Sequence, residues 1–169
     1  MDEVLDLRNE IDKLTLAQIS ISLILQVDRT QNAATKYFSE HTSGLEPTFH
    51  LSGLSGDIYL LLLASNRLAR IFHKNLSLSP FILSQSELTS IHNLRNIWEH
   101  QGPFEAGGET IMSDLHDNSK KWINEKFGGN AGRVFTLSFH EYSLTIADSV
   151  TINKIREEAV EWKNLVFGD

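Results

Sequence analysis

Apolar side chains recur at alternating steps of three and four along the first 25 residues, which is the spacing of one face of an α-helix. The stripe consists of Val4, Leu7, Ile11, Leu14, Ile21 and Leu25. We expect it to be the buried side of a first helix, with a bend or a change of face at Gln18, which interrupts it. A second helical stretch is predicted from Thr30 to Glu40. Ser43-Gly44 and Pro47 then predict a loop from His41 to Pro47.

The segment from Asp57 to Lys74 is the most apolar helix candidate in the chain. It is apolar on nearly all sides between Ile58 and Ala64, so we place this helix at the centre of the fold. The second half carries basic side chains that must reach water or a partner, namely Arg67, Arg70, His73 and Lys74. A connection that contains serine and proline is predicted from Leu76 to Leu83.

The next helix has a start signal and a stop signal. Ser84-Gln85-Ser86-Glu87 has the S-x-x-E form of a capping box, in which the serine caps the helix and the glutamate reaches back. Gly102 and Pro103 predict its end. Its buried side is predicted to consist of Leu88, Ile91, Leu94, Ile97 and Trp98.

In the last third of the chain, the spacing of the apolar residues changes from helical to alternating and then back to helical. A helix is predicted from Thr110 to Lys126, and Gly128-Gly129 ends it. Alternating apolar residues then predict a β-hairpin at about residues 134–147, with its turn near His140 to Ser143. A closing amphipathic helix follows, marked by Ile152, Ile155, Ala159, Trp162 and Val166. The predicted fold is therefore mainly α: a bundle of about five helices with a short appended hairpin.

The composition fits one domain over residues 1–169, because 41% of the 169 residues are hydrophobic. There is no cysteine, which excludes disulfides and thiolate metal sites and favours a reducing compartment. The N-terminal segment lacks the layout of a signal peptide, and the longest apolar run, Ile58 to Ala64, is too short to cross a bilayer. We therefore expect a cytoplasmic protein without membrane contact.

The net charge of −7 argues against a protein that binds nucleic acid tightly over its whole surface, although it permits a local basic pocket. The seven histidines are scattered, and no spacing among them points to a metal site. No glycine-rich phosphate loop follows a predicted strand. We expect neither a metal nor a cofactor.

Candidate chemistry is concentrated in the segment His92 to Pro103, HNLRNIWEHQGP. His92, Asn96 and His100 are successive i, i+4 neighbours and form one polar stripe, with Arg95 beside it. A purely structural interpretation is also available. Arg95 and Glu99 are spaced to pair at the surface, and His100 would interact with the helix dipole.

Arg95 and His100 are separated by about 140° around a helix axis, so one straight helix cannot bring both side chains to one atom. Two copies of the helix that meet across a two-fold axis could surround one shared cleft. If this segment is an active site, its geometry therefore favours a homodimer with a composite site.

The run Arg95-Asn96-Ile97-Trp98-Glu99-His100, near the end of a helix in a small helical protein, resembles the R-x4-6-H signature of the HEPN superfamily. The polar residue after the arginine, Asn96, agrees with that family. The resemblance implies a helical bundle that dimerises through the motif helices. It also implies a metal-independent endoribonuclease of the kind found in toxin–antitoxin and phage-defence systems, with RNA as substrate and a protein antitoxin as a candidate partner.

On that resemblance Arg95, Asn96 and His100 are the catalytic residues, and the products are a 2′,3′-cyclic phosphate and a 5′-hydroxyl. His92, Arg67 and Arg70 are the candidate substrate-binding residues, and the alternative for the two arginines is a solvated helix end. Two other functions stay open. One is a HEPN-like module without catalysis that binds RNA, a nucleotide or a protein, and the other is a helical protein unrelated to the family.

Overall fold

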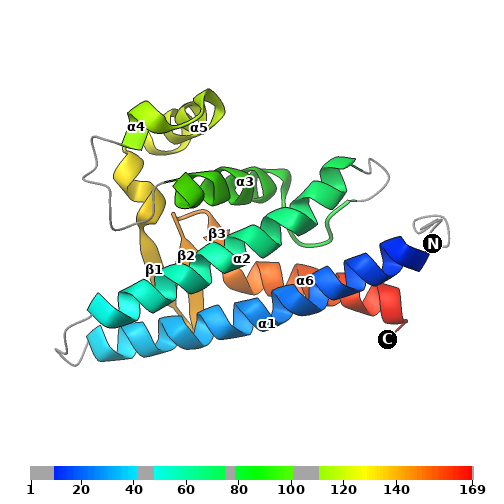
Figure 1. Cartoon of the computed structure of the whole chain (residues 1–169). Coiled ribbons are helices and arrows are strands. Elements are labelled where there is room, and N and C mark those ends of the chain that lie inside the picture. The colour runs from blue at the N-terminus through cyan, green and yellow to red at the C-terminus, as the bar shows by residue number, and fades with distance from the viewer. Residues whose placement is uncertain (1–9, 42–47, 75–78, 101–110, 169) are drawn as a thin grey trace.

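The computed structural model describes residues 10–41, 48–74, 79–100 and 111–168. Within these ranges the chain is mainly helical with a small antiparallel sheet, so the predicted fold class is confirmed (Figure 1). The helices are α1 (Glu10–His41), α2 (Thr48–Lys74), α3 (Gln85–His100), α4 (Ile111–Asp114), α5 (Asp117–Phe127) and α6 (Ile152–Phe167). A 3-10 helix (Ala131–Phe135) precedes strands β1 (Leu137–His140), β2 (Ser143–Ile146) and β3 (Val150–Thr151).

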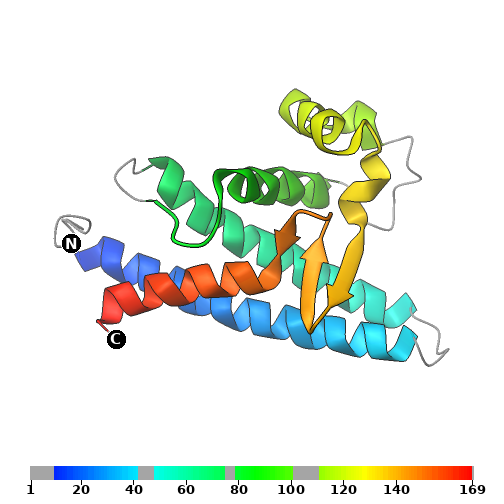
Figure 2. The same ribbon diagram turned by 180° about the vertical axis from the view of Figure 1, so that it is seen from behind.

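The long helices α1 and α2 run antiparallel along each other and form the body of the molecule. Helix α6 packs along α1, while α3 packs along the opposite side of α2 (Figures 1 and 2). The short helix α5 lies over α3, far from α1. The motif helix α3 is therefore held between α2 and α5, and both neighbours can contribute side chains to a site on it.

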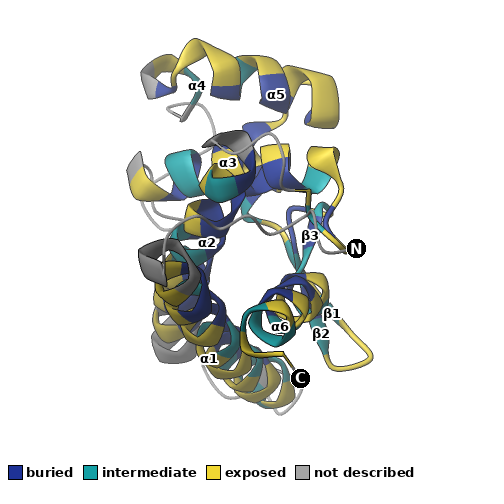
Figure 3. Cartoon of the chain, turned by 90° about the vertical axis from the view of Figure 1, so that its right-hand side faces the viewer, coloured by how far each residue is buried: buried dark blue, intermediate teal, exposed yellow. Residues whose placement is uncertain are grey.

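Helix α1 corrects the prediction of its buried side. Leu14 and Leu25, which belong to the predicted stripe, are 60% and 64% exposed, and Ile21 is also exposed. The side that packs into the core instead carries Leu16, Ala17, Ser20, Leu23, Val27, Thr30 and Ala34. Figure 3 shows this buried side facing the other helices. The predicted stripe was wrong, and its members Val4, Leu7 and Ile11 lie outside the residues whose side chains are described.

Two polar residues, Ser20 and Thr30, lie on the true buried side of α1 and concealed it in the sequence. Thr30 is fully buried. Its Oγ1 donates to the Gln26 carbonyl at 2.8 Å and contacts the Asp57 carbonyl at 3.2 Å, so the hydroxyl is paired inside the core. A hydroxyl that is satisfied in this way is tolerated in a helix interface. The helix is also continuous through Thr30, so the separate helix predicted from Thr30 to Glu40 does not exist.

The centre of the core is formed by α2, as predicted, although the helix begins at Thr48 rather than at Asp57. Its fully buried residues include Leu54, Ile58, Leu61 and Leu62. The predicted buried side of α3 is also confirmed, since Leu88, Ile91, Leu94, Ile97 and Trp98 are all buried.

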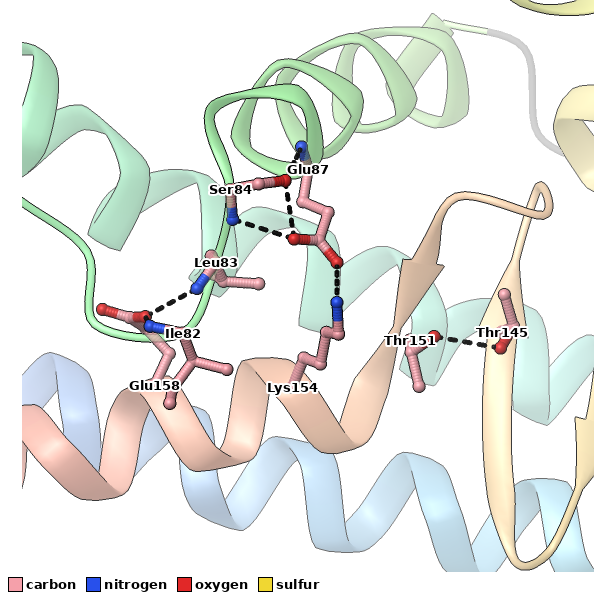
Figure 4. Close-up of polar contacts among 8 residues, drawn as sticks. All are labelled: Ile82, Leu83, Ser84, Glu87, Thr145, Thr151, Lys154 and Glu158. Atoms are coloured by element: carbon pink, nitrogen blue, oxygen red, sulfur yellow. Dashed lines mark hydrogen bonds and ion pairs between the residues drawn. The ribbon is translucent and has the colours of Figure 1, made fainter.

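The capping box at the start of α3 forms as predicted (Figure 4). The Ser84 backbone N–H donates to Glu87 Oε2 at 2.8 Å, and the Glu87 N–H donates to Ser84 Oγ at 3.2 Å. Lys154 from α6 adds a hydrogen bond to Glu87 Oε1 at 2.8 Å. Partial burial alone would raise the pKa of Glu87, but the bonds from Lys154 and Ser84 and the charge of Lys154 outweigh it and lower that pKa.

A buried carboxylate anchors the chain segment that leads into α3. Glu158 of α6 is fully buried and accepts backbone N–H bonds from Phe81, Ile82 and Leu83 at 3.0, 2.6 and 2.9 Å. The Trp162 indole N–H donates to the same carboxylate at 2.6 Å. Two of these backbone donors are visible in Figure 4. Four donors satisfy the buried charge, and they fix where α3 begins relative to α6.

The predicted hairpin is present as β1 and β2, with His140 opposite Ser143. Its two turn residues, Glu141 and Tyr142, have φ values of 49° and 59°, which is the pattern of a type I′ turn. The third strand, β3, was not predicted and pairs with β2.

The helix predicted from Thr110 to Lys126 is divided into α4 and α5 in the described part of the chain. His116 caps α5 with an extended backbone, and Gly128 ends the helix at a φ of 60°. The break is important for the site because it places His116 at the first turn of α5.

Candidate functional site

A chain of side-chain hydrogen bonds runs along α3 and across to α2. Arg95 Nη2 pairs with Glu99 Oε1 at 2.8 Å, and Arg95 Nη1 donates to Asn96 Oδ1 at 3.0 Å. The Asn96 amide nitrogen lies 3.3 Å from His92 Nε2. His92 Nδ1 lies 3.2 Å from Oδ1 of Asn66, which is buried on α2. The i, i+4 spacing on one helix face brings the α3 members together.

The donors and acceptors in this chain determine the state of the His92 ring. Because Arg95 donates to Asn96 Oδ1, the Asn96 amide presents its NH₂ group toward His92. His92 Nε2 therefore accepts, and Nδ1 carries the proton and donates to Asn66 Oδ1. The motif arginine thus acts on His92 through Asn96.

A groove lies beside this chain, between α3 and α5, with α2 at one end. Its volume is about 780 Å³, which falls in the usual range for ligand sites, roughly 300–1,000 Å³. The polar residues that line it are Arg70, Thr89, His92, Asn93, Asn96, His116, Asn118, Ser119, Lys121 and Glu125, and Trp122 also contributes.

The two walls of the groove are joined by a buried polar contact. Ser119 Oγ of α5 donates to Asn93 Oδ1 of α3 at 3.2 Å, and the Asn93 amide donates to the Thr89 carbonyl at 2.9 Å. Asn93 is 6% exposed and Ser119 is 2% exposed. Because both groups are buried and paired, we expect the width of the groove to be set before any ligand binds.

His116 is held in one tautomer by the helix that it caps. The Asn118 backbone N–H donates to His116 Nδ1 at 3.3 Å, which satisfies one of the unpaired N–H groups at the start of α5. A neutral ring with an accepting Nδ1 carries its proton on Nε2. In their neutral forms, the two imidazoles that line the groove therefore carry the proton on different ring nitrogens, Nδ1 for His92 and Nε2 for His116.

The structure separates the predicted substrate-binding residues. Arg70 lines the same groove as His92 and Asn96. Arg67, three residues earlier on α2, lines a different groove against α1, together with Gln18. The two arginines therefore line separate grooves in the described part of the molecule.

The structure gives a different result for each of the three predicted catalytic residues. Asn96 lines the groove. Arg95 is engaged by Glu99 and Asn96, which confirms the surface pair with Glu99 that its spacing predicts, and its buried Nε has no acceptor among the described residues. The side chain of His100 lies outside the described residues.

Sequence reasoning did not select His116, Lys121, Asn66 or Asn93. His116 and Lys121 belong to a segment predicted as ordinary helix, and nothing in their spacing relates them to α3. A histidine at the start of a helix was the available signal for His116, but it required the helix boundary to be known.

The described residues contain no group of three or more histidine, aspartate or glutamate side chains arranged to hold a metal ion. None of the helices in the described ranges has the length and apolar character needed to cross a membrane. Comparison of the chain with protein-family models, with curated proteins and with solved structures finds no match.

Proposed function

We propose that this protein is a HEPN-type, metal-independent endoribonuclease that acts as a cytoplasmic homodimer. The observation that carries the proposal is the hydrogen-bonded chain from Arg95 through Asn96 to His92, at the wall of a groove that also contains Arg70. A cation, an amide and an imidazole in contact provide the group types that act on a phosphodiester without a metal. The motif's resemblance to the HEPN signature supplies the family.

The proposed reaction uses the nucleophile that RNA already carries. A neutral His100 takes the proton of a ribose 2′-hydroxyl, and the 2′-oxygen forms a bond to phosphorus. The bond from phosphorus to the 5′-oxygen breaks, and the His100 ring, now charged by the proton that it has taken up, protonates that oxygen. Arg95 opposes the negative charge that grows on the phosphate. The products are a 2′,3′-cyclic phosphate and a 5′-hydroxyl, and DNA is resistant because it lacks the 2′-hydroxyl.

The surface pair of Arg95 with Glu99 is compatible with this role. Both side chains are partly exposed, at 25% and 33%, and exposed pairs of this kind contribute only about 0–1 kcal/mol. A phosphate can therefore replace Glu99 at modest cost. Arg95 binds Asn96 through Nη1 and Glu99 through Nη2, so a phosphate that replaces Glu99 would be bound by the same guanidinium that orients Asn96.

The test is RNA cleavage in the presence of EDTA. We expect the purified protein to cut single-stranded or structured RNA, to leave 2′,3′-cyclic ends, and to spare DNA of the same sequence. Arg95→Ala and His100→Ala should each lower the rate by about 100-fold or more. Arg133→Ala and His140→Ala are matched controls, since both residues are exposed and lie away from the groove. Cleavage that needs a metal, or that survives both motif variants, would refute the proposal.

The alternative is a HEPN-like module that binds RNA, a nucleotide or a protein without cutting. The engaged state of Arg95 favours this alternative, because an arginine bound to Glu99 and Asn96 can serve a structural purpose. A dimer that binds RNA and leaves it intact under all conditions tested would support the module. Slower growth of a host that expresses the wild type, but not His100→Ala, would support a toxin controlled by an antitoxin.

A further inference from the structure

We infer that the groove between α3 and α5 of a single chain holds a phosphodiester of the RNA strand, and that His116, which is outside the motif, contacts it. This deepens the proposed function, on which the identity of the ligand as RNA rests. The residues come from three elements of the same chain: Arg70 from α2, His92 from α3, and Lys121 from α5 together with the residue that caps it, His116.

The groove presents hydrogen-bond donors of the kind that a phosphate requires. Arg70 and Lys121 each supply a cationic donor. His116 supplies an Nε2–H, because its Nδ1 is occupied by the Asn118 N–H at 3.3 Å. Of these groups, His116 is at the N-terminal end of the 11-residue helix α5, whose dipole also favours an anion. Three separate donors therefore face one groove.

The acidic group in the groove does not cancel these donors. Glu125 Oε1 lies 3.8 Å from Lys121 Nζ, and the two side chains are 65% and 75% exposed. An exposed pair with this separation holds neither partner strongly. The whole chain has a net charge of −7, so long-range repulsion opposes binding of a polyanion. We therefore expect affinity to come from short-range contacts in the groove and to fall as salt is added.

The chain offers a matched control for each donor. Arg67 carries the same charge as Arg70 on the same helix but lines a different groove. Lys120 precedes Lys121 and pairs with Asp117 outside the groove. His140 is an exposed histidine at the end of β1, next to the hairpin turn. For His116 itself, asparagine is the best replacement, because it is a strong N-cap and keeps the start of α5 intact while it removes the imidazole.

The first experiment measures fluorescence anisotropy of a single-stranded 2′-O-methyl oligoribonucleotide, which cannot be cut because its 2′-oxygen is blocked. We expect Arg70→Gln, Lys121→Gln and His116→Asn to weaken binding by about threefold to tenfold each, the range for loss of one hydrogen bond. Arg67→Gln, Lys120→Gln and His140→Asn should leave binding within about twofold. Equal losses in the two sets would overturn the inference, because they would indicate binding through overall charge.

The second experiment locates the ligand without relying on variants. In ¹⁵N spectra of the imidazole rings, the same oligonucleotide should shift the His116 and His92 signals and leave that of His140 in place. Inorganic phosphate alone should produce the His116 shift at higher concentration. Shifts confined to other histidines would place the RNA elsewhere and overturn the inference.

The outcomes separate this inference from the proposed function. Binding in the groove by a protein that never cuts RNA would keep the phosphodiester site and remove the nuclease. Cleavage that needs Arg95 and His100, but is unchanged in Arg70→Gln and His116→Asn, would keep the nuclease and remove the groove.

Discussion

At the scale of single residues, the site depends on side chains that determine the protonation and orientation of their neighbours. Asn96 is oriented by Arg95 on one side and donates toward His92 on the other. His116 is placed by the backbone of the helix that it caps. The same device holds Glu87, whose carboxylate accepts from Ser84 and Lys154 at the start of the motif helix. The orientation of each of these side chains is therefore set by neighbouring groups, which its position in the sequence alone does not reveal.

Glu87 gives a prediction about acid stability. Its pKa is lowered in the folded protein, so its carboxylate stabilises the fold at pH values above the unfolded pKa. That contribution is lost as the pH falls through the folded pKa. At pH 7 we expect Glu87→Gln to reduce the free energy of unfolding by a few tenths to about 1 kcal/mol. The difference should begin to shrink as the pH falls below the ordinary glutamate pKa of about 4.3, and it should vanish once the pH is below the lowered pKa of the folded state.

The measurement is urea unfolding of the wild type and of Glu87→Gln at several pH values from 7 to acid. Lys154→Met should reproduce the effect, because Lys154 is the partner that does most to lower this pKa. A difference between wild type and variant that stays constant across the whole pH series would contradict the assignment.

At the scale of elements, the helices show which features of the fold are local and which are decided by packing. The start and the buried side of α3 were predictable, because the capping box and the apolar spacing lie within one stretch of sequence. The buried side of α1 was not, since two stripes of equal spacing compete and only contact with α2 and α6 selects one. The break before α5 was missed because neither glycine nor proline marks it.

Helix α1 supplies the prediction at this scale, from two leucines two positions apart. Leu23 is fully buried and Leu25 is 64% exposed. We expect Leu23→Ala to lower the free energy of unfolding by about 2–5 kcal/mol, because it removes packed methyl groups and leaves a cavity. Leu25→Ala should change the stability of the monomer by less than about 0.5 kcal/mol. Thermal or urea unfolding at low protein concentration measures both. A larger loss of unfolding free energy in Leu25→Ala than in Leu23→Ala would support the buried side that was first predicted from the sequence.

The groove shows the limit of sequence reasoning about the site itself. Arg95 and Asn96 are adjacent, and His92 follows from helical spacing, so their association could be predicted. His116 is 24 positions beyond His92, and the two meet in one groove because α5 folds back over α3. The separation of Arg67 from Arg70 likewise depends on which neighbour each side of α2 faces.

At the scale of the whole molecule, α3 occupies a position between α2 and α5 that allows two kinds of site. The groove is built within one chain from three elements. The motif pair, Arg95 and His100, is separated by about 140° around the α3 axis and requires two chains to converge. We therefore expect a homodimer in which each RNA strand is held by one chain and cut between two.

Mixing subunits that carry different substitutions distinguishes the site within one chain from the site between two chains. If Arg95 and His100 act across the dimer, random exchange of Arg95→Ala and His100→Ala subunits makes half of the dimers mixed, and each of these has one intact site. Activity should recover to about a quarter of the wild-type value.

Arg70→Gln and His116→Asn should not complement each other, because a groove within one chain is damaged in every subunit. Cleavage assays on refolded mixtures measure both. Absence of recovery for Arg95→Ala with His100→Ala, in a mixture shown to contain mixed dimers, would contradict a composite site, because only a site built across two chains can be restored by exchange.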